Sequence, residues 1–168
     1  MNCLRVTKYN PQNRDRNDIY LKKEWTSIGD VGKIFNDTMF TFESYLVYEE
    51  AYIDAILRIM RENKLKSFKI EALEKKSYVN YNDFFDSESQ KYFSSLKNNM
   101  VISIHDITPI IRFTLRELIW CKLISHKMFV HFGYDYYMYI GSEKQLENVL
   151  EDIKNNGLFI EPMVSPYM

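Results

Sequence analysis

The order of strand and helix signals after residue 100 constrains the fold more than any other feature of the chain. The segment MVISIH (residues 100–105) predicts a strand. Thr108 followed by Pro109 then indicates a helix start, because proline fits the first helical position. The apolar run IIRFTLRELIWCKLI predicts that this helix continues to about residue 124.

Two strands, a second helix and a last strand are predicted to follow. KMFVHF and DYYMYI predict strands around a short connection. Ser142 and Gln145 form a capping box for a helix that Gly157 would stop in a left-handed cap, and LFIEPM predicts the closing strand. The order from residue 100 onward is therefore βαββαβ. This is the ferredoxin-like arrangement, an antiparallel sheet with both helices on one face.

The first half contains one strong helix. FTFESYLVYEEAYIDAILRIMREN carries apolar side chains at helical spacing, and Thr41 can cap its start. Asp54 and Arg58 are spaced for an ion pair one turn apart. Strands are predicted on either side of this helix, at CLRVTKY (residues 3–9) and SFKIEAL (residues 67–73).

Shorter signals complete the first half. Ser27 and Asp30 resemble a capping box for a short helix, and the large ring of Trp25 is expected to anchor this segment to the body. Ser87 and Gln90 form another capping box. No linker, repeat or low-complexity tract divides the chain. We therefore expect a single α+β domain over residues 1–168, with the first half packed on or beside the C-terminal sheet.

The stretch HFGYDYYMYIG (residues 131–141) predicts a β-hairpin. Gly133 and Tyr134 fit a two-residue type II′ turn, since glycine occupies the first central position. Side chains alternate across a strand, so Met138 and Ile140 are expected on the core face. The opposite face would carry the aromatic residues Phe129, His131, Tyr137 and Tyr139. We expect the first half of the chain to cover that face; left uncovered, it would be a binding surface.

Charge and hydropathy argue against two classes of partner. A formal net charge of −1 gives no overall basic field for nucleic acid, and HFGYDYY lacks the basic opening residue of the RNA-binding signature. No uncharged apolar run approaches the roughly 20 residues that span a bilayer. The N-terminus has no signal-peptide core, and Cys3 and Cys121 form no Cys-x-x-Cys pair. We therefore expect reduced thiols and a cytoplasmic protein.

Motifs for catalysis, metal binding or cofactor binding are not found in the sequence. His105, His126 and His131 lack metal-ligand spacing, and no phosphate-binding glycine loop occurs. Cys121 is expected in the core of an apolar helix. We expect no enzyme activity, metal or cofactor. The alternative is a small enzyme with dispersed catalytic residues, drawn from His105, Asp106 and His131.

Acidic side chains gather on the long helix and in the central loop. They predict either a solvated surface or one complementary to a basic protein partner, with tyrosines as anchors. The candidate partner-binding residues are Glu49, Glu50, Asp54, Asp83, Asp86, Tyr137 and Tyr139.

The segments RVTKYNP and EWTSIGDVGK, together with HFGYDYYMYIG, resemble a group of small bacterial proteins associated with immunity to polymorphic or contact-dependent growth-inhibition toxins. The resemblance implies a cytoplasmic protein that binds and neutralises one cognate toxin domain without catalysis or a cofactor. From the charge and hydropathy we expect no nucleic-acid or membrane partner, and we expect a monomer or weak dimer. A further alternative is a homo-oligomeric structural or regulatory protein that pairs through the hairpin edge.

Overall fold

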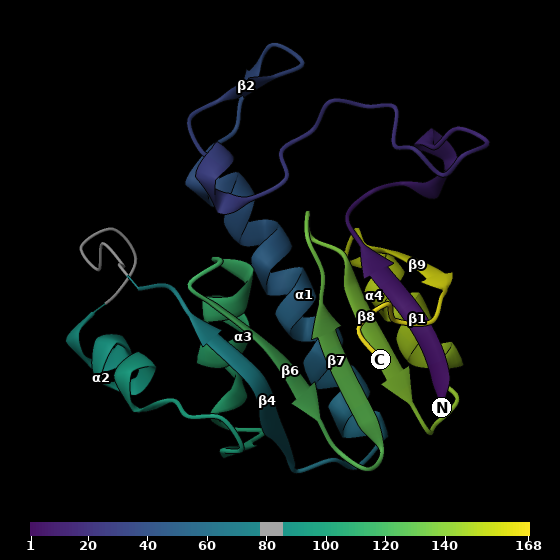
Figure 1. The fold of residues 1–168 in the computed structure, drawn as a ribbon. Helices are drawn as coiled ribbons and strands as arrows, with labels where there is room; N and C mark the ends of the chain where they lie inside the picture. Colours follow the sequence, from purple (N-terminus) through teal and green to yellow (C-terminus); the bar gives the residue numbers. More distant parts are fainter. Residues whose placement is uncertain (78–85) are drawn as a thin grey trace.

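A seven-stranded antiparallel sheet is the centre of the computed structural model, which describes residues 1–77 and 86–168 (Figure 1). The strand order is β5-β4-β6-β7-β8-β1-β9. The strands are β1 (Asn2–Thr7), β4 (Ser67–Lys75), β5 (Val101–Ser103), β6 (Ile119–Ile124), β7 (Met128–Phe132), β8 (Met138–Ser142) and β9 (Phe159–Pro162). Because β1 lies between β8 and β9, the N-terminal strand is built into the C-terminal sheet.

Helices cover one face of this sheet. Figure 1 shows α1 (Phe42–Glu62), α3 (Ile107–Leu115) and α4 (Glu147–Asn155) on the same side, and α2 (Ser87–Ser95) beside β4. Helix α1 lies along the sheet because its apolar stripe is wide: Tyr45, Tyr52, Ile56, Ile59 and Met60 are all fully buried. The result is one α+β domain with two layers.

The segment between β1 and α1 is mostly irregular. It contains two 3₁₀ turns, Pro11–Asn13 and Ile28–Asp30, and the small hairpin of β2 (Ile34–Phe35) and β3 (Thr38–Met39). The expected capping box of Ser27 and Asp30 is confirmed, although it closes only a single 3₁₀ turn. Trp25 is buried and stacks on Phe40 at 4.5 Å between ring centroids, so it does anchor this segment.

Several predicted local signals are confirmed. Thr41 caps α1, its hydroxyl accepting a hydrogen bond from the Ser44 amide at 3.2 Å. Asp54 and Arg58 form the expected ion pair at 2.5 Å. Gly157 follows α4 with a φ of 86°, the left-handed cap that its position predicts. The strands predicted at residues 3–9 and 67–73 appear as β1 and β4.

The prediction that the helix after Pro109 continues to about residue 124 is wrong for the second half of that segment. Helix α3 ends at Leu115, and Ile119–Ile124 is the strand β6, with side chains that alternate between buried and half-buried. Glu117 takes a left-handed φ of 57°, and the amide of Leu118 donates to the Phe113 carbonyl at 2.9 Å. This is a Schellman ending with a glutamate in the place that glycine usually takes.

This added strand changes the topology. Three strands, β6, β7 and β8, separate α3 from α4, and β4 and β1 from the first half are inserted between the C-terminal strands. The ferredoxin-like order is therefore not confirmed. The β7–β8 hairpin has no free edge to which a second copy of the chain could add a strand, because β7 pairs with β6 and β8 pairs with β1. The predicted pairing of two chains through this edge is therefore wrong.

Two predicted capping boxes are wrong. Helix α2 is capped by Asp86, whose Oδ1 accepts from the Ser89 amide at 2.8 Å, and not by Ser87. Helix α4 starts after Leu146 with no side-chain cap. Ser142 instead belongs to β8, where its buried hydroxyl contacts the side-chain amide of Asn63.

Two further observations concern membranes and thiols. None of the helices in residues 1–77 and 86–168 combines the length and the apolar character needed to cross a bilayer. Cys3 and Cys121 are both free thiols. Cys121 lies in strand β6 and not in a helix, and its burial raises the pKa of the thiol to about 12.

Candidate functional site

The connection between β7 and β8 is a five-residue loop, Gly133–Tyr137. Phe132 pairs with Met138, and the amide of Gly133 donates to the Tyr137 carbonyl at 2.7 Å. The predicted two-residue type II′ turn at Gly133 and Tyr134 is therefore wrong. Space at 133 is tight, because a Cβ there would lie 3.1 Å from the Tyr137 carbonyl oxygen and 3.2 Å from the ring of Tyr139, so these neighbours would have to move slightly.

Two other loop residues take the left-handed conformation. Asp135 has a φ of 53° and Tyr136 a φ of 62°. For so bulky a side chain as Tyr136 this conformation is strained, and it persists only where the surroundings impose it. The Tyr136 hydroxyl lies 2.7 Å from the Tyr45 hydroxyl and 3.0 Å from the Leu115 carbonyl, and the Tyr52 hydroxyl donates to the Tyr136 carbonyl at 2.5 Å. These contacts fix the loop against α1 and the end of α3.

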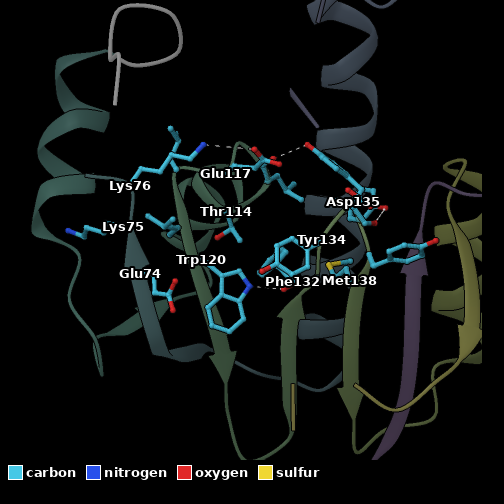
Figure 2. A pocket seen from close by; sticks show the side chains of 17 residues that line it. Glu74, Lys75, Lys76, Thr114, Glu117, Trp120, Phe132, Tyr134, Asp135 and Met138 are labelled. Carbon is cyan, nitrogen blue, oxygen red and sulfur yellow. Dashed lines mark hydrogen bonds and ion pairs between the residues drawn. The ribbon is translucent and has the colours of Figure 1, made fainter. Parts of the chain in front are cut away.

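A pocket of about 400 Å³ lies between this loop, the turn from α3 to β6, and the end of β4 (Figure 2). Its aromatic lining includes Trp120, Phe132 and Tyr134, and the indole nitrogen of Trp120 donates to the Phe132 carbonyl at 2.8 Å. Tyr134 is 85% exposed, more than any other large hydrophobic side chain in the described part of the chain. A pocket with aromatic walls and a few polar groups is the usual form of a binding site, so this pocket is the candidate functional site.

Among the described residues, the charged lining of the pocket comprises the carboxylates of Glu74, Glu117 and Asp135 and two lysines. Lys76 lies 3.9 Å from Glu117, which is a weak pair. Lys75 donates to the carbonyls of Phe93 and Ser94 in α2, and Figure 2 shows its side chain pointing away from the pocket. Within residues 1–77 and 86–168, the carboxylates of Glu74 and Asp135 take part in no ion pair or hydrogen bond. The pocket therefore presents an excess of negative charge.

The acidic residues predicted on α1 do not form a free surface. Glu49 is fully buried and its carboxylate accepts two hydrogen bonds from Arg116, at 2.8 and 2.7 Å, so its expected place on a solvated helix face is wrong. Glu50 is exposed but pairs with Arg112 at 2.5 Å. Asp54 pairs with Arg58, and it accepts a hydrogen bond from Asn156 in the turn after α4. These carboxylates mainly join α1 to its neighbours.

The aromatic face of the hairpin is covered, but mostly not by the first half of the chain. Tyr139 is buried under Tyr167, with ring centroids 6.0 Å apart, and the His131 Nδ1 lies 2.8 Å from the Ser165 hydroxyl. The C-terminal segment, residues 163–168, thus covers this part of the sheet. The N-terminal segment covers this face through Arg5, whose guanidinium lies 5.0 Å from the Tyr137 ring centroid and which is the register partner of Tyr139. The expectation that the first half covers the whole face is wrong.

The remaining candidates lie apart from this pocket. Asp86 is exposed but serves as the cap of α2, and Asp83 lies outside the described residues. Asp86, His105 and Asp106 line a second, more open hollow of about 560 Å³ beside α2. The Asp106 carboxylate accepts a hydrogen bond from Ser103 at 2.6 Å and does not cap α3. His105 and Asp106, two of the three candidate catalytic residues, therefore line the same hollow. The third candidate, His131, does not line it.

That third candidate, His131, is buried between the sheet and the C-terminal segment. Its pKa is lowered to about 4 by burial and by the charge of Lys122, so its imidazole is neutral near pH 7. It lines neither hollow. Among the described residues, no group of three or more histidine, cysteine, aspartate or glutamate side chains is placed to hold a metal ion. The arrangement fits a buried structural histidine.

Comparisons with protein-family models, curated proteins and solved structures gave no match to this chain. The pocket and its charges are therefore the main basis for a functional assignment.

Proposed function

We propose that this chain is a non-enzymatic protein-binding domain and that the pocket end of the sheet is its partner surface. The more specific form of the proposal is a cytoplasmic immunity protein that binds and neutralises a cognate toxin domain. The resemblance of the sequence to immunity proteins supports this form, and the geometry supports binding in general.

The observation that carries the proposal is the exposed ring of Tyr134, in the lining of a preformed pocket. Tyrosine buries a large area on binding and loses little side-chain entropy, which makes it a frequent interface anchor. The loop that carries it is held by the hydrogen bonds of Tyr136 to α1 and α3. A partner would therefore meet a surface that is already ordered, which lowers the entropic cost of association.

Further exposed apolar side chains lie on the β2–β3 hairpin and on the first half of α1. Ile34 and Met39 of the β2–β3 hairpin are exposed, as is Val47 on α1. In Figure 1 this hairpin extends beyond the N-terminal end of α1, the same end at which Tyr45 contacts the β7–β8 loop. Such side chains would add apolar area to an interface that is centred on the pocket.

One observation supports the alternative that the chain is an enzyme: His105 and Asp106 both line the hollow beside α2. Asp106 is already hydrogen-bonded to Ser103, and the third candidate, His131, is buried elsewhere. The three candidates thus do not meet in one site, and the hollow holds only two of them. Binding is therefore the better-supported function.

The test is to produce the chain together with the toxin domain of a secreted protein encoded beside its gene. We expect restored growth and a direct complex by calorimetry. Tyr134→Ala should weaken that complex about 10- to 100-fold, as for an interface hot spot. Val101→Ala, an exposed side chain on the distant strand β5, is the matched control and should leave affinity unchanged. Full affinity of the Tyr134→Ala protein would remove the pocket end from the interface.

A further inference from the structure

We propose that the pocket binds an arginine side chain of the partner protein. The inference rests on the proposed function, since a partner must supply the residue, and it adds the chemistry of the contact. Four features carry it: the charge balance of the lining, its aromatic walls, the contacts that hold its indole and backbone, and the pocket volume.

The charge balance favours a cation. Three carboxylates line the pocket, Glu74, Glu117 and Asp135, and two lysines stand against them. One of these, Lys75, is engaged by the carbonyls of Phe93 and Ser94 at 2.8 and 3.2 Å and is turned toward α2 (Figure 2). Of the lysines that line the described part of the pocket, Lys76 remains, at 3.9 Å from Glu117, while outside the lining the charge of Lys8 interacts with Asp135. A positively charged group that enters the pocket would therefore meet opposite charge.

The aromatic walls favour a guanidinium over an ammonium group. Figure 2 shows the indole of Trp120 with Glu74 on one side of it and Phe132 and Tyr134 on the other. A guanidinium is planar and weakly hydrated, so it can stack on an aromatic ring while its edge donates hydrogen bonds to a carboxylate. An ammonium group is strongly hydrated and loses more on entering an aromatic site. The combination of rings with adjacent carboxylates therefore selects arginine.

The indole of Trp120 and the backbone around the pocket are held in place by contacts within the chain. The indole of Trp120 is held by the Phe132 carbonyl, and its ring centroid lies 5.8 Å from that of Tyr167. The backbone at Glu117 is held by the Schellman ending of α3, and the backbone at Asp135 by its place in the loop between two paired strands. Because the backbone and the indole need little reordering, the entropic cost of binding a single inserted side chain is confined mainly to the exposed carboxylate side chains.

The volume of about 400 Å³ lies within the range of small-molecule sites, and the pocket is partly open to solvent. A side chain that is presented by a partner would fill it while the partner surface covered the exposed Tyr134. The same guanidinium chemistry exists in free arginine, so the test must separate the two sources.

The experiment is a ¹H–¹⁵N NMR titration of the full chain with two tripeptides, acetyl-Gly-Arg-Gly-amide and the matched acetyl-Gly-Gln-Gly-amide. With the arginine peptide, we expect saturable shifts of the Trp120 indole N–H and of the amides of residues 133–137. A single contact of this kind corresponds to a Kd on the order of 1 mM. The glutamine peptide should give no saturable shift at the same concentrations.

Variants then test the assigned carboxylates. Glu74→Gln combined with Asp135→Asn should weaken binding of the arginine peptide at least about fivefold, as expected from the loss of two exposed charge contacts. Asparagine tolerates the left-handed φ of residue 135, so the loop should keep its shape. Glu62→Gln, an exposed carboxylate at the end of α1, is the matched control and should have no effect.

Three outcomes would overturn the inference. The first is equal binding of the two peptides, and the second is full affinity of the Glu74→Gln, Asp135→Asn protein. The third is free arginine that binds about 100-fold more tightly than the peptide, which would make the pocket a small-molecule site. None of these results would alter the effect of Tyr134→Ala on toxin binding, so failure of this inference and failure of the proposed function remain distinguishable.

Discussion

The hydroxyl groups of Tyr136 and Tyr45 are hydrogen-bonded at 2.7 Å, which joins the β7–β8 loop to the first turn of α1. Both side chains are buried, and burial raises the pKa of each phenol well above its usual value. The same Tyr136 hydroxyl lies 3.0 Å from the Leu115 carbonyl at the end of α3. One phenol therefore connects three segments that surround the pocket, and it keeps Tyr136 in a strained backbone conformation.

Removal of the Tyr136 hydroxyl should destabilise the protein. Tyr136→Phe leaves the Tyr45 hydroxyl and the Leu115 carbonyl without this partner, so we expect a loss of about 1–3 kcal/mol in the free energy of unfolding. Tyr45→Phe should cost less, about 0.5–1.5 kcal/mol, because Tyr136 keeps its bond to Leu115. Urea denaturation measures both. Tyr134→Phe, on the exposed ring of the same loop, is the control and should change stability by less than about 0.5 kcal/mol.

Glu49 and Glu50 are neighbours in sequence, but Glu49 forms a buried ion pair and Glu50 an exposed one. Glu49→Ala should lower the free energy of unfolding by about 3–5 kcal/mol, because it leaves the Arg116 guanidinium largely buried without its carboxylate. Glu50→Ala removes an exposed pair with Arg112 and should cost no more than about 1 kcal/mol. Thermal and urea unfolding of the two variants would check this contrast. Equal stability of the two proteins would contradict the buried ion pair.

The end of α3 shows where sequence patterns reach their limit. Gly157 and Glu117 take the same left-handed position after a helix, but only the glycine is a recognisable stop signal. Because glutamate gives no such signal, the apolar run after it predicts a continued helix. Sequence patterns therefore predict α1, α4, β1 and β4, yet they miss β6 and, with it, the turn that places Glu117 in the pocket.

The candidate site shows a related limit. Alternation along β7 and β8 correctly separates Met138 and Ile140 from His131 and Tyr139. Which segment covers the second face depends on contacts between residues far apart in the chain, such as His131 with Ser165, and no local pattern encodes these. The aromatic side chain that is exposed is therefore not one of those on this face, such as Tyr139, but Tyr134 in the connecting loop. The sequence pattern predicts a tight turn at Tyr134 and gives no sign of this exposure.

His131 should make stability depend on pH in a defined window. Its pKa is lowered from 6.5 to about 4 in the folded protein, so the unfolded chain binds the proton more readily between these values. The free energy of unfolding should therefore be insensitive to this group above pH about 6.5 and decrease as the pH falls from about 6.5 to about 4. His131→Gln should show a smaller decrease over that window in urea denaturation. Identical pH profiles of the two proteins would contradict the buried neutral imidazole.

Gly141 should not tolerate a side chain. It pairs with Phe129 across β8 and β7, and a Cβ at this position would overlap the Phe129 ring. Because Phe129 is itself buried, Gly141→Ala should cost about 1–3 kcal/mol through overpacking. Phe129→Leu in the same chain should recover part of that loss, which a double-mutant cycle would measure. Gly29→Ala, where the nearest atom is the Ser27 hydroxyl at 3.3 Å, is the control and should have a small effect.

Substitution of Glu117 tests two effects of this residue separately: its backbone strain, which affects stability, and its carboxylate, which affects binding in the pocket. Glu117→Gly removes the cost of a left-handed glutamate, about 1–2 kcal/mol, whereas the exposed contact with Lys76 at 3.9 Å is worth at most about 1 kcal/mol. The free energy of unfolding should therefore stay the same or rise by up to about 2 kcal/mol, as measured by urea denaturation. The same variant removes one pocket carboxylate and should weaken binding of the arginine peptide. Glu117→Gln, which keeps the backbone strain, should weaken that binding equally without the gain in stability. A large loss of stability in the glycine variant would show that the Glu117 side chain, and not the backbone position alone, holds the end of α3.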